Sequence, residues 1–336
     1  MMHSVKLFDN TLRDGGNVVG HGFSRELTLS IVSGLLKAGI QDIELGNCKG
    51  LGAYTLNGAT KACSDEEYFD MLQPYLAQGR IGMFLLASNG AKAPVEMAAE
   101  TGLNFLRVGA NAGDGKGSVA AIERVKKSGL ICRYSLMKAY VSTPDELAEE
   151  ARMLQDAGVD KITVMDSAGT MFPEDARAYV DALKSVLSIP VGFHGHSNLG
   201  LSQANALAAV EAGADEIDCG LLGMARSAGN CATELAAATL IKKGYLPEVD
   251  LFTLLDYLEQ DLIPVMSESY GYRPAINPTD LMLGLAGCHS NYLPELRAVA
   301  AEEGVSLLRL IERVSAVNRK NPDKALMHSV AASLKA

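Results

Sequence analysis

The stretch Pro190-Val-Gly-Phe-His-Gly-His-Ser-Asn198 begins as a short apolar run and ends with two histidines that are two residues apart. Side chains alternate between the two faces of a β-strand, so residues at positions i and i+2 point to the same side. The stretch is therefore predicted to be a strand that presents His194 and His196 together at its carboxyl end. Two imidazoles placed in this way can hold a divalent metal, although two separately satisfied histidines are the commoner meaning of such a pair.

The composition is that of an ordinary globular chain. Its 336 residues are 48% hydrophobic and 21% charged, which allows one large domain or two smaller ones. The net charge of -10 and the lack of a basic run argue against a nucleic-acid partner. No window approaches the run of about 18 apolar residues that a membrane span needs, so no membrane contact is expected. The six cysteines form no Cys-x-x-Cys pair and the N-terminus has no apolar signal region, which predicts a cytoplasmic protein with reduced thiols.

One unit recurs from residue 5 to residue 243, a short β-rich apolar run followed by an amphipathic helix rich in Ala and Leu. Ser24, Ser64 and Thr143, the last followed by Pro144, stand where helix N-caps are needed. The predicted strands are 5–9, 40–46, 80–87, 105–110, 131–139, 161–168, 190–198 and 216–223. The predicted helices between them are 24–38, 65–77, 93–101, 118–128, 144–157, 174–187, 199–212 and 230–243.

Strands that alternate with helices are parallel strands joined in βαβ units, and eight such units predict a closed (β/α)8 TIM barrel in the α/β class. A doubly wound open sheet is the alternative, but no Gly-x-Gly-x-x-Gly follows the first strand. We assign residues 1–245 to a catalytic barrel and residues 246–336 to an α-helical C-terminal extension packed on it. Helices are predicted in this extension at 250–261, 279–286, 292–303, 305–318 and 322–334.

Reactive groups of such a barrel gather at the carboxyl ends of its strands. The first strand runs into Arg13 and Asp14, and the seventh supplies His194 and His196. One carboxylate and two imidazoles suit an open site for Mn²⁺, Mg²⁺, Fe²⁺, Co²⁺ or Zn²⁺. Arg13 adds a donor for a carboxylate or an enolate, although a local ion pair with Asp14 is its ordinary meaning. A metal together with an arginine is what carbanion chemistry beside a carbonyl requires.

The motifs at the carboxyl ends of the predicted strands resemble those of the metal-dependent lyase and aldolase superfamily, the DRE-TIM metallolyases. The motifs are Asp9-Asn-Thr-Leu-Arg13-Asp14-Gly15, His194-x-His196-x-Asn198 and Gly223-Met-Ala-Arg-Ser-Ala-Gly-Asn230. This group includes hydroxymethylglutaryl-CoA lyase, isopropylmalate synthase and 4-hydroxy-2-oxovalerate aldolase. The sequence looks most like the last of these, and the similarity extends to the tail segment Gly284-Leu-Ala-Gly-Cys-His-Ser-Asn-Tyr292.

The resemblance implies a divalent-metal-dependent aldolase that cleaves a 4-hydroxy-2-oxo acid, such as 4-hydroxy-2-oxovalerate, to pyruvate and an aldehyde. Mn²⁺ is the metal that it favours, with Mg²⁺, Co²⁺ or Zn²⁺ as alternatives. It assigns Arg13 to the pyruvate enolate and Ser167 to the substrate carboxylate. The implied metal ligands are Asp14, His194, His196 and, less directly, Asn230.

Two positions depart from the aldolase pattern. Asn17 stands where the family usually has a histidine base, and His289 stands where it usually has a tyrosine. An amide cannot act as a base near pH 7, whereas an imidazole can. We therefore expect His289, or less directly His21, to take the proton of the substrate 4-hydroxyl, and Asn17 to contact the substrate. The alternative is a changed substrate or reaction in which His289 only lines the pocket.

Two other classes of function stay open. A Claisen-type acyltransferase or acyl-CoA lyase is disfavoured because no CoA-binding or regulatory domain follows the barrel. A degenerate barrel that acts as a scaffold would have no need of a converging metal triad. The expected partners are a small-molecule 2-oxo acid, further copies of the chain, and, by resemblance, an acylating aldehyde dehydrogenase at the C-terminal helices. Tyr134, Leu86, Met165 and Leu285 are expected to set the length of the aldehyde.

Overall fold

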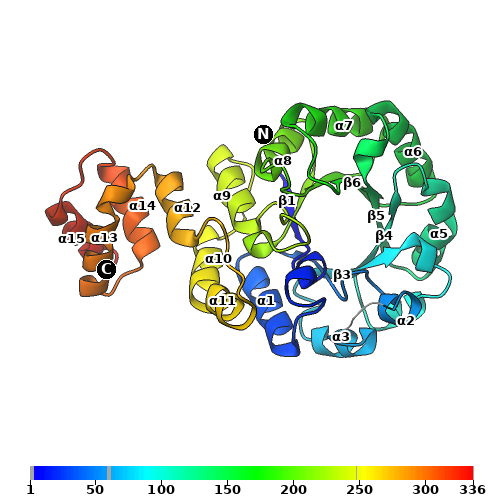
Figure 1. The fold of residues 1–336 in the computed structure, drawn as a ribbon, viewed down its shortest axis with the longest axis horizontal. Coiled ribbons are helices and arrows are strands. Elements are labelled where there is room, and N and C mark those ends of the chain that lie inside the picture. The colour runs from blue at the N-terminus through cyan, green and yellow to red at the C-terminus, as the bar shows by residue number, and fades with distance from the viewer. Residues whose placement is uncertain (1–3, 59–61, 247, 336) are drawn as a thin grey trace. The chain divides into compact units, whose positions relative to one another are not determined.

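The computed structural model describes residues 4–58, 62–246 and 248–335. Within these residues the strands form one closed parallel barrel in chain order, in which β8 returns to pair with β1 (Figure 1). The predicted (β/α)8 barrel is confirmed. Its strands are β1 (Lys6–Asp9), β2 (Asp42–Leu45), β3 (Arg80–Leu86), β4 (Phe105–Asn111), β5 (Ile131–Met137), β6 (Lys161–Asp166), β7 (Val191–Gly195) and β8 (Glu216–Cys219).

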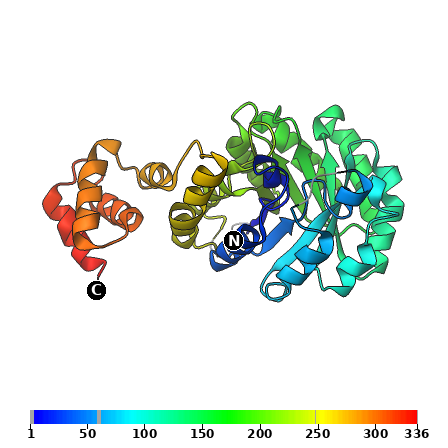
Figure 2. The same ribbon diagram turned by 60° about the horizontal axis from the view of Figure 1, so that its bottom comes forward.

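Helices surround the ring of strands, as the view in Figure 2 also shows. The predicted caps form: Ser24 accepts the amide of Leu27, while Ser64 and Thr143 each make a reciprocal capping box with a glutamate. A short helix, α2 (Ala53–Leu56), was not predicted. The helices that follow the strands are α1 (Arg25–Lys37), α3 (Asp65–Leu72), α4 (Val95–Glu100), α5 (Val119–Lys127), α6 (Pro144–Asp156), α7 (Pro173–Val186), α8 (Ser202–Glu211) and α9 (Thr233–Lys243).

Charged side chains fill the amino-terminal half of the barrel interior, where branched apolar residues are usual. Arg133 donates to both carboxylate oxygens of Glu216, at 3.1 and 3.2 Å, and also to Asp42. Lys161 donates to Glu216 at 2.5 Å, and the guanidinium of Arg133 lies 4.5 Å from the centre of the Phe8 ring. A buried charge is tolerated only when it is paired in this way. Ion pairs therefore fill this end of the barrel interior in place of apolar side chains.

The chain divides into two compact units, Met1–Val249 and Asp250–Ala336, with a boundary slightly later than the one expected at residue 245. The predicted helix 250–261 runs on through a π-helical turn, η6 (Leu258–Leu262), and Pro264 lies in the first turn of α11, where its missing N–H is tolerated. Packing of this unit on the barrel stays a prediction. Its helices are α10 (Leu251–Tyr257), α11 (Ile263–Tyr270), α12 (Pro278–Ala286), α13 (Leu293–Glu303), α14 (Leu307–Val317) and α15 (Lys324–Ser333).

In the part of the chain that the structure describes, no helix is both long enough and apolar enough to cross a membrane.

Candidate metal centre and substrate pocket

Three buried side chains at the carboxyl ends of the strands bring potential metal ligands together. Asp14 opens a 3₁₀ turn, η1 (Asp14–Val18), just after β1, whereas His194 lies in β7 and His196 directly follows it. The two Nε2 atoms are 3.4 Å apart, and Oδ2 of Asp14 lies 4.0 Å from that of His194 and 3.8 Å from that of His196. Ligands of one ion with bonds of about 2.1 Å stand about 3.0–3.4 Å apart, so a small inward shift of Asp14 would complete the set. The predicted triad is therefore brought together.

Asn230 lies beside this triad. It faces His196 across an isolated β-bridge, and its Nδ2 donates to Oδ2 of Asp14 and to Oδ1 of Asn10, each at 3.1 Å. Its own Oδ1 is buried and has no hydrogen-bond partner among the described residues. A buried amide oxygen left without a donor needs a partner, and an amide oxygen is a suitable ligand for a hard divalent ion.

Asp218 of β8 fixes the orientation of His194. Its Oδ2 lies 3.2 Å from Nδ1 of His194, and the amide nitrogen of Asn10 lies at the same distance from that atom. An ionised carboxylate can only accept, so the tautomer that pairs with Asp218 carries its proton on Nδ1 and keeps the Nε2 lone pair for a metal. In that tautomer the Asn10 amide nitrogen, itself a donor, makes no hydrogen bond to the ring. This is the carboxylate–histidine arrangement that commonly supports metal-ligating imidazoles.

Asp14 and His196 are in the protonation states that a metal requires. Burial would raise the pKa of Asp14, but Arg13, the two histidines and Arg226 outweigh it and hold that pKa well below its usual range. Burial and the neighbouring His194 lower the pKa of His196 to about 4. A carboxylate and a neutral imidazole therefore stand ready near pH 7, so neither group has to release a proton before it binds a cation.

Arg13 carries one donor that the protein does not use. Its Nε donates to Oε1 of Glu44 at 2.6 Å, and one terminal nitrogen lies 3.2 Å from Oδ1 of Asp14. Its other terminal nitrogen, Nη2, is buried without a partner among the described residues. Burial lowers the pKa of Arg13, but Glu44 and Asp14 more than offset this and raise it, so the side chain stays charged. The guanidinium lies 5.2 Å from the centre of the Phe84 ring, which limits its freedom to turn away.

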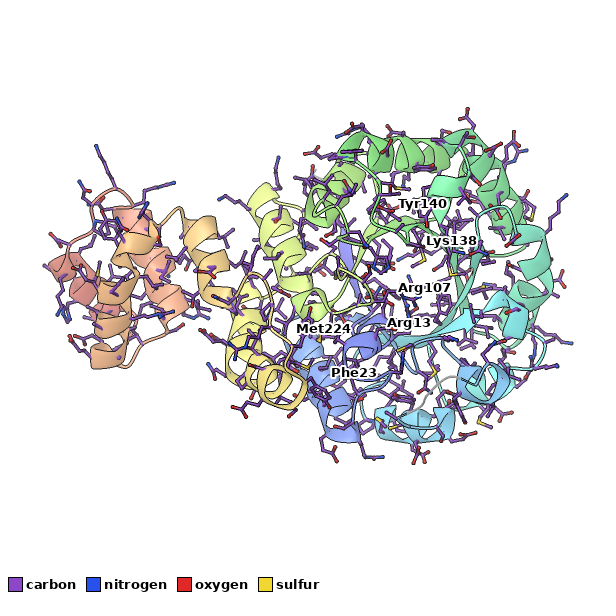
Figure 3. All side chains as sticks on the ribbon, viewed as in Figure 1. Arg13, Phe23, Arg107, Lys138, Tyr140 and Met224 are labelled. Carbon is purple, nitrogen blue, oxygen red and sulfur yellow. The ribbon has the colours of Figure 1, made fainter. Side chains whose placement is uncertain are left out.

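A line of buried ion pairs joins Arg13 to the metal ligand His194. Arg107 donates to both oxygens of Glu44, at 2.7 and 2.8 Å, and its other terminal nitrogen donates to Asp218. Glu44 thus contacts both arginines, and Asp218 contacts both Arg107 and the imidazole. Figure 3 shows Arg13 and Arg107 on the inner side of the ring. Because every member is buried, moving one of them unpairs the next.

A cavity of about 300 Å³ opens over Arg13 and the triad. This is within the size range of small-molecule sites. The walls combine apolar side chains with several cations. The lining residues are Arg13, Asp14, Cys48, Lys49, Phe84, Leu86, Asn111, Met137, Lys138, Met165, Ser167, His194, His196 and Arg226.

Of the remaining predicted site residues, some line the cavity and others do not. Ser167 lines the cavity, and its Oγ accepts the amide of Lys138 at 2.9 Å. Asn17 and His21 are not among the described lining residues, since the amide of Asn17 donates to the carbonyl of Asp14 at 2.8 Å and His21 is exposed. His289 belongs to the second unit, where it is exposed and its Nδ1 accepts the amide of Asn291 at 3.2 Å.

Sequence reasoning placed one residue wrongly and overlooked others. Tyr134, expected at the mouth, points to the helix layer, where its hydroxyl lies 2.8 Å from Oγ of Ser118. Strand alternation explains this, because Arg133 and Ser135 take the inward positions. Lys49, Phe84 and Asp218 were not singled out. The signal for Asp218 was the spacing of Glu216 and Asp218, two acids at i and i+2 in a buried strand.

A closed (β/α)8 barrel with a carboxylate and two imidazoles converging at the carboxyl ends of its strands has the architecture of a metal-dependent barrel enzyme. Residues 4–260 match the HMGL-like family, and the chain belongs to that family.

The names of similar proteins agree with this family assignment. A 4-hydroxy-2-oxovalerate aldolase of Carboxydothermus hydrogenoformans is 36% identical over 304 residues, which are 90% of this chain and 88% of the relative. An oxaloacetate decarboxylase of Mycobacterium tuberculosis is 35% identical over 309 residues, 92% of this chain and 90% of the relative. The N-terminal domain of a putative aldolase from Bacteroides vulgatus has the same fold, with a TM-score of 0.66 and 21% identity over 80% of this chain and 90% of the other.

Proposed function

We propose that the protein is a divalent-metal-dependent aldolase that cleaves a 4-hydroxy-2-oxo acid, such as 4-hydroxy-2-oxovalerate, to pyruvate and an aldehyde. The observation that carries this proposal is the free, buried Nη2 of Arg13 beside the triad of Asp14, His194 and His196. Both features serve a reaction in which negative charge develops on an oxygen next to the breaking bond. The names of the HMGL-like relatives support it.

The chemistry divides between the cavity residues. Asp14, His194, His196 and Asn230 would hold the cation, which supplies Lewis-acid charge for the 2-oxo group. Arg13 donates through Nη2 to the oxygen that becomes the enolate, and Ser167 contacts the substrate carboxylate. A base removes the proton of the 4-hydroxyl, the C3–C4 bond breaks, and its electron pair becomes the pyruvate enolate. A proton delivered to C3 then completes pyruvate.

We assign the base to His289, with His21 as the alternative, because Asn17 cannot serve. The amide of Asn17 is engaged with Asp14, so its contact with substrate would follow from a rotation of that amide. Replacing His289 by Ala should lower kcat by about 10²–10⁴. Full turnover by that variant would remove the assignment.

Mn²⁺ is the proposed ion, with Mg²⁺, Co²⁺ or Zn²⁺ as alternatives. One carboxylate, two imidazoles and an amide oxygen form a mixed nitrogen and oxygen set, which suits Mn²⁺ better than a thiolate site would. None of the six cysteines, all of which lie in the described ranges, forms a disulfide, and none belongs to the cluster of Asp14, His194 and His196.

Decarboxylation of oxaloacetate is a second candidate activity. The observation in its favour is the relative of that name in Mycobacterium tuberculosis. Loss of CO₂ from oxaloacetate produces the same pyruvate enolate, so Arg13 and the triad would serve both reactions. No relative reported above supports an acyl-CoA lyase or a Claisen-type acyltransferase over these activities.

We also propose a cellular setting and partners for the protein. Buried cysteines that form no disulfide suit the reducing cytoplasm. The exposed Val265, Ile276 and Val317 of the C-terminal unit offer apolar contacts for a homo-oligomer or for an acylating aldehyde dehydrogenase.

The test is pyruvate release, coupled to lactate dehydrogenase, from 4-hydroxy-2-oxo acids of graded length. Metal-stripped protein should be inactive and should recover activity with Mn²⁺. The His196→Ala variant should stay inactive with the same addition, while the exposed His328→Ala serves as the matched control. No pyruvate from any of these acids, with metal shown to be bound, would overturn the proposal.

A further inference from the structure

The cavity carries more positive charge than the proposed substrate needs. Besides Arg13, it is lined by Lys49, Lys138 and Arg226, which follow β2, β5 and β8, whereas Asp14 is the only carboxylate among the described lining residues. The whole chain has a net charge of -10, so an excess of cations at this one place is not a general property of the surface.

Two of these cations have no acidic partner among the described residues. Neither Lys49 nor Lys138 makes an ion pair with any residue that the structure describes, and both are exposed at the cavity. Arg226 is 56% exposed, and its Nε lies 3.5 Å from Oδ1 of Asp14. Arg13, by contrast, is already balanced by Glu44. Lys49 and Lys138 are therefore the two cavity residues whose positive charge is available to pair with an anionic ligand.

The backbone holds Lys138 in place. Its φ angle of 54° lies in the left-handed region, which is uncommon for residues with a Cβ and recurs at functional sites. Its amide donates to Oγ of Ser167, the proposed contact of the substrate carboxylate. Figure 3 shows Lys138 and Arg107 both within the circle of helices. The hydrogen bond ties the backbone of Lys138 to the end of β6, and the lysine side chain lines the cavity.

A 4-hydroxy-2-oxo acid with an uncharged tail leaves these lysines unused. Its one carboxylate would be met by the cation, Arg13 and Ser167 at the reacting end. We infer that the natural substrate is a dianion, a 4-hydroxy-2-oxo acid that carries a second anionic group, carboxylate or phosphate, at the end away from the 2-oxo group. Lys49 and Lys138 bind that group. This inference rests on the proposed aldolase function and specifies its substrate class.

The reaction remains a balanced retro-aldol cleavage. The 4-hydroxyl proton passes to the base, the C3–C4 bond breaks, and its electron pair becomes the pyruvate enolate, which takes a proton at C3. The second product is an aldehyde that keeps the anionic group. The six-carbon diacid 4-hydroxy-2-oxohexanedioate, for example, gives pyruvate and 3-oxopropanoate.

The test compares substrates matched in length. Pyruvate release is measured from 4-hydroxy-2-oxohexanedioate, from uncharged-ended 4-hydroxy-2-oxohexanoate, and from the 5-phosphate of 4,5-dihydroxy-2-oxopentanoate, all with Mn²⁺-loaded full-length protein. One charge-assisted contact predicts kcat/KM at least about tenfold higher for an anionic-ended substrate. The diacid and the phosphate arms distinguish the two sources of anion. The preference should shrink as ionic strength rises, because exposed charges are screened.

Variants of the two lysines test whether these residues cause the preference for an anionic-ended substrate. Lys49→Gln and Lys138→Gln should each lower the ratio of diacid to uncharged-ended kcat/KM by about tenfold, mainly through KM. Lys37→Gln, at the end of α1, is the matched control and should leave that ratio unchanged. Calorimetry gives a reading without turnover: 2-oxoglutarate should bind more tightly than 2-oxopentanoate, and the lysine variants should remove the difference.

The outcomes separate the two proposals. Pyruvate from the uncharged-ended acid with no preference for either anionic substrate overturns the inference and leaves the aldolase function standing. A preference that survives in both lysine variants overturns the assigned residues. No pyruvate from any of these acids overturns the aldolase function, and the inference falls with it.

Discussion

Replacement of Arg13 by lysine tests the role of a single donor atom. In the protein, Nε of Arg13 donates to Glu44 at 2.6 Å and one terminal nitrogen lies 3.2 Å from Asp14. The other, Nη2, is buried and has no partner in the described part of the chain. A lysine has one nitrogen. It can keep the ion pair with Glu44, but it cannot reach into the cavity at the same time. The variant therefore keeps the charge and loses the donor that meets the enolate oxygen.

The expected cost follows from that loss. Removing one donor to a developing oxyanion costs about 10²–10³ in kcat, or about 2.7–4 kcal/mol of transition-state stabilisation. KM should change less, because the ground-state carbonyl oxygen carries less charge than the enolate. Initial rates of pyruvate release at saturating Mn²⁺ provide both constants.

The matched control is Arg80→Lys. Arg80 donates through Nε to Asp42 at 2.9 Å, is not a lining residue of the cavity, and should leave kcat within about twofold of the original. A melting curve and a metal titration of each variant show that the barrel and the triad persist. If Arg13→Lys kept kcat within about fivefold with its triad intact, Arg13 would not be the enolate donor.

Three further predictions concern metal binding and the stability of the barrel. Asp218→Asn should weaken Mn²⁺ binding by about 10–100-fold in a calorimetric titration, and an affinity within twofold would contradict the proposed hold on the imidazole. Burial raises the pKa of Glu234 to about 7, so its contribution to stability is present below the unfolded pKa near 4.5 and is lost as pH rises through 7. Urea unfolding should show a decline of about 2–3 kcal/mol from this group between pH 5 and 8, which Glu234→Gln reduces and Glu149→Gln keeps. Gly50 has a φ of 88°, and an added Cβ would lie 2.1 Å from a backbone oxygen; Gly50→Ala should cost more than about 2 kcal/mol, whereas Gly117→Ala, which has open space, should cost less than about 0.5, and equal costs would refute the clash.

The barrel could be predicted because its periodicity is local. Each strand from Lys6–Asp9 to Glu216–Cys219 is a short β-rich segment followed by a helix, and caps such as Ser24 mark where the helices begin. The triad could be predicted for the same reason, since His194 and His196 stand two residues apart at the end of one strand and Asp14 follows another.

What sequence reasoning missed depends on pairings across the barrel. The line from Arg13 through Glu44 and Arg107 to Asp218 joins four separate strands or their ends, and no spacing in the sequence says which arginine meets which acid. The uncompensated lysines are also a property of the folded cavity, because an unpaired charge is recognised only when its neighbours are known. The continuation of the predicted helix 250–261 through Pro264 was missed because a proline there is ordinarily a stop signal.

The central claim is that this site makes and stabilises the enolate of pyruvate, and hydrogen exchange at the methyl group of pyruvate tests it without any knowledge of the aldehyde. Metal-stripped and Mn²⁺-loaded protein are incubated with pyruvate in D₂O, and deuterium in the methyl group is measured by mass spectrometry. The account predicts incorporation only with metal, slowed at least about 100-fold by Arg13→Lys and abolished by His196→Ala. A methyl group that stays protonated as in buffer, with Mn²⁺ shown to be bound, would contradict it.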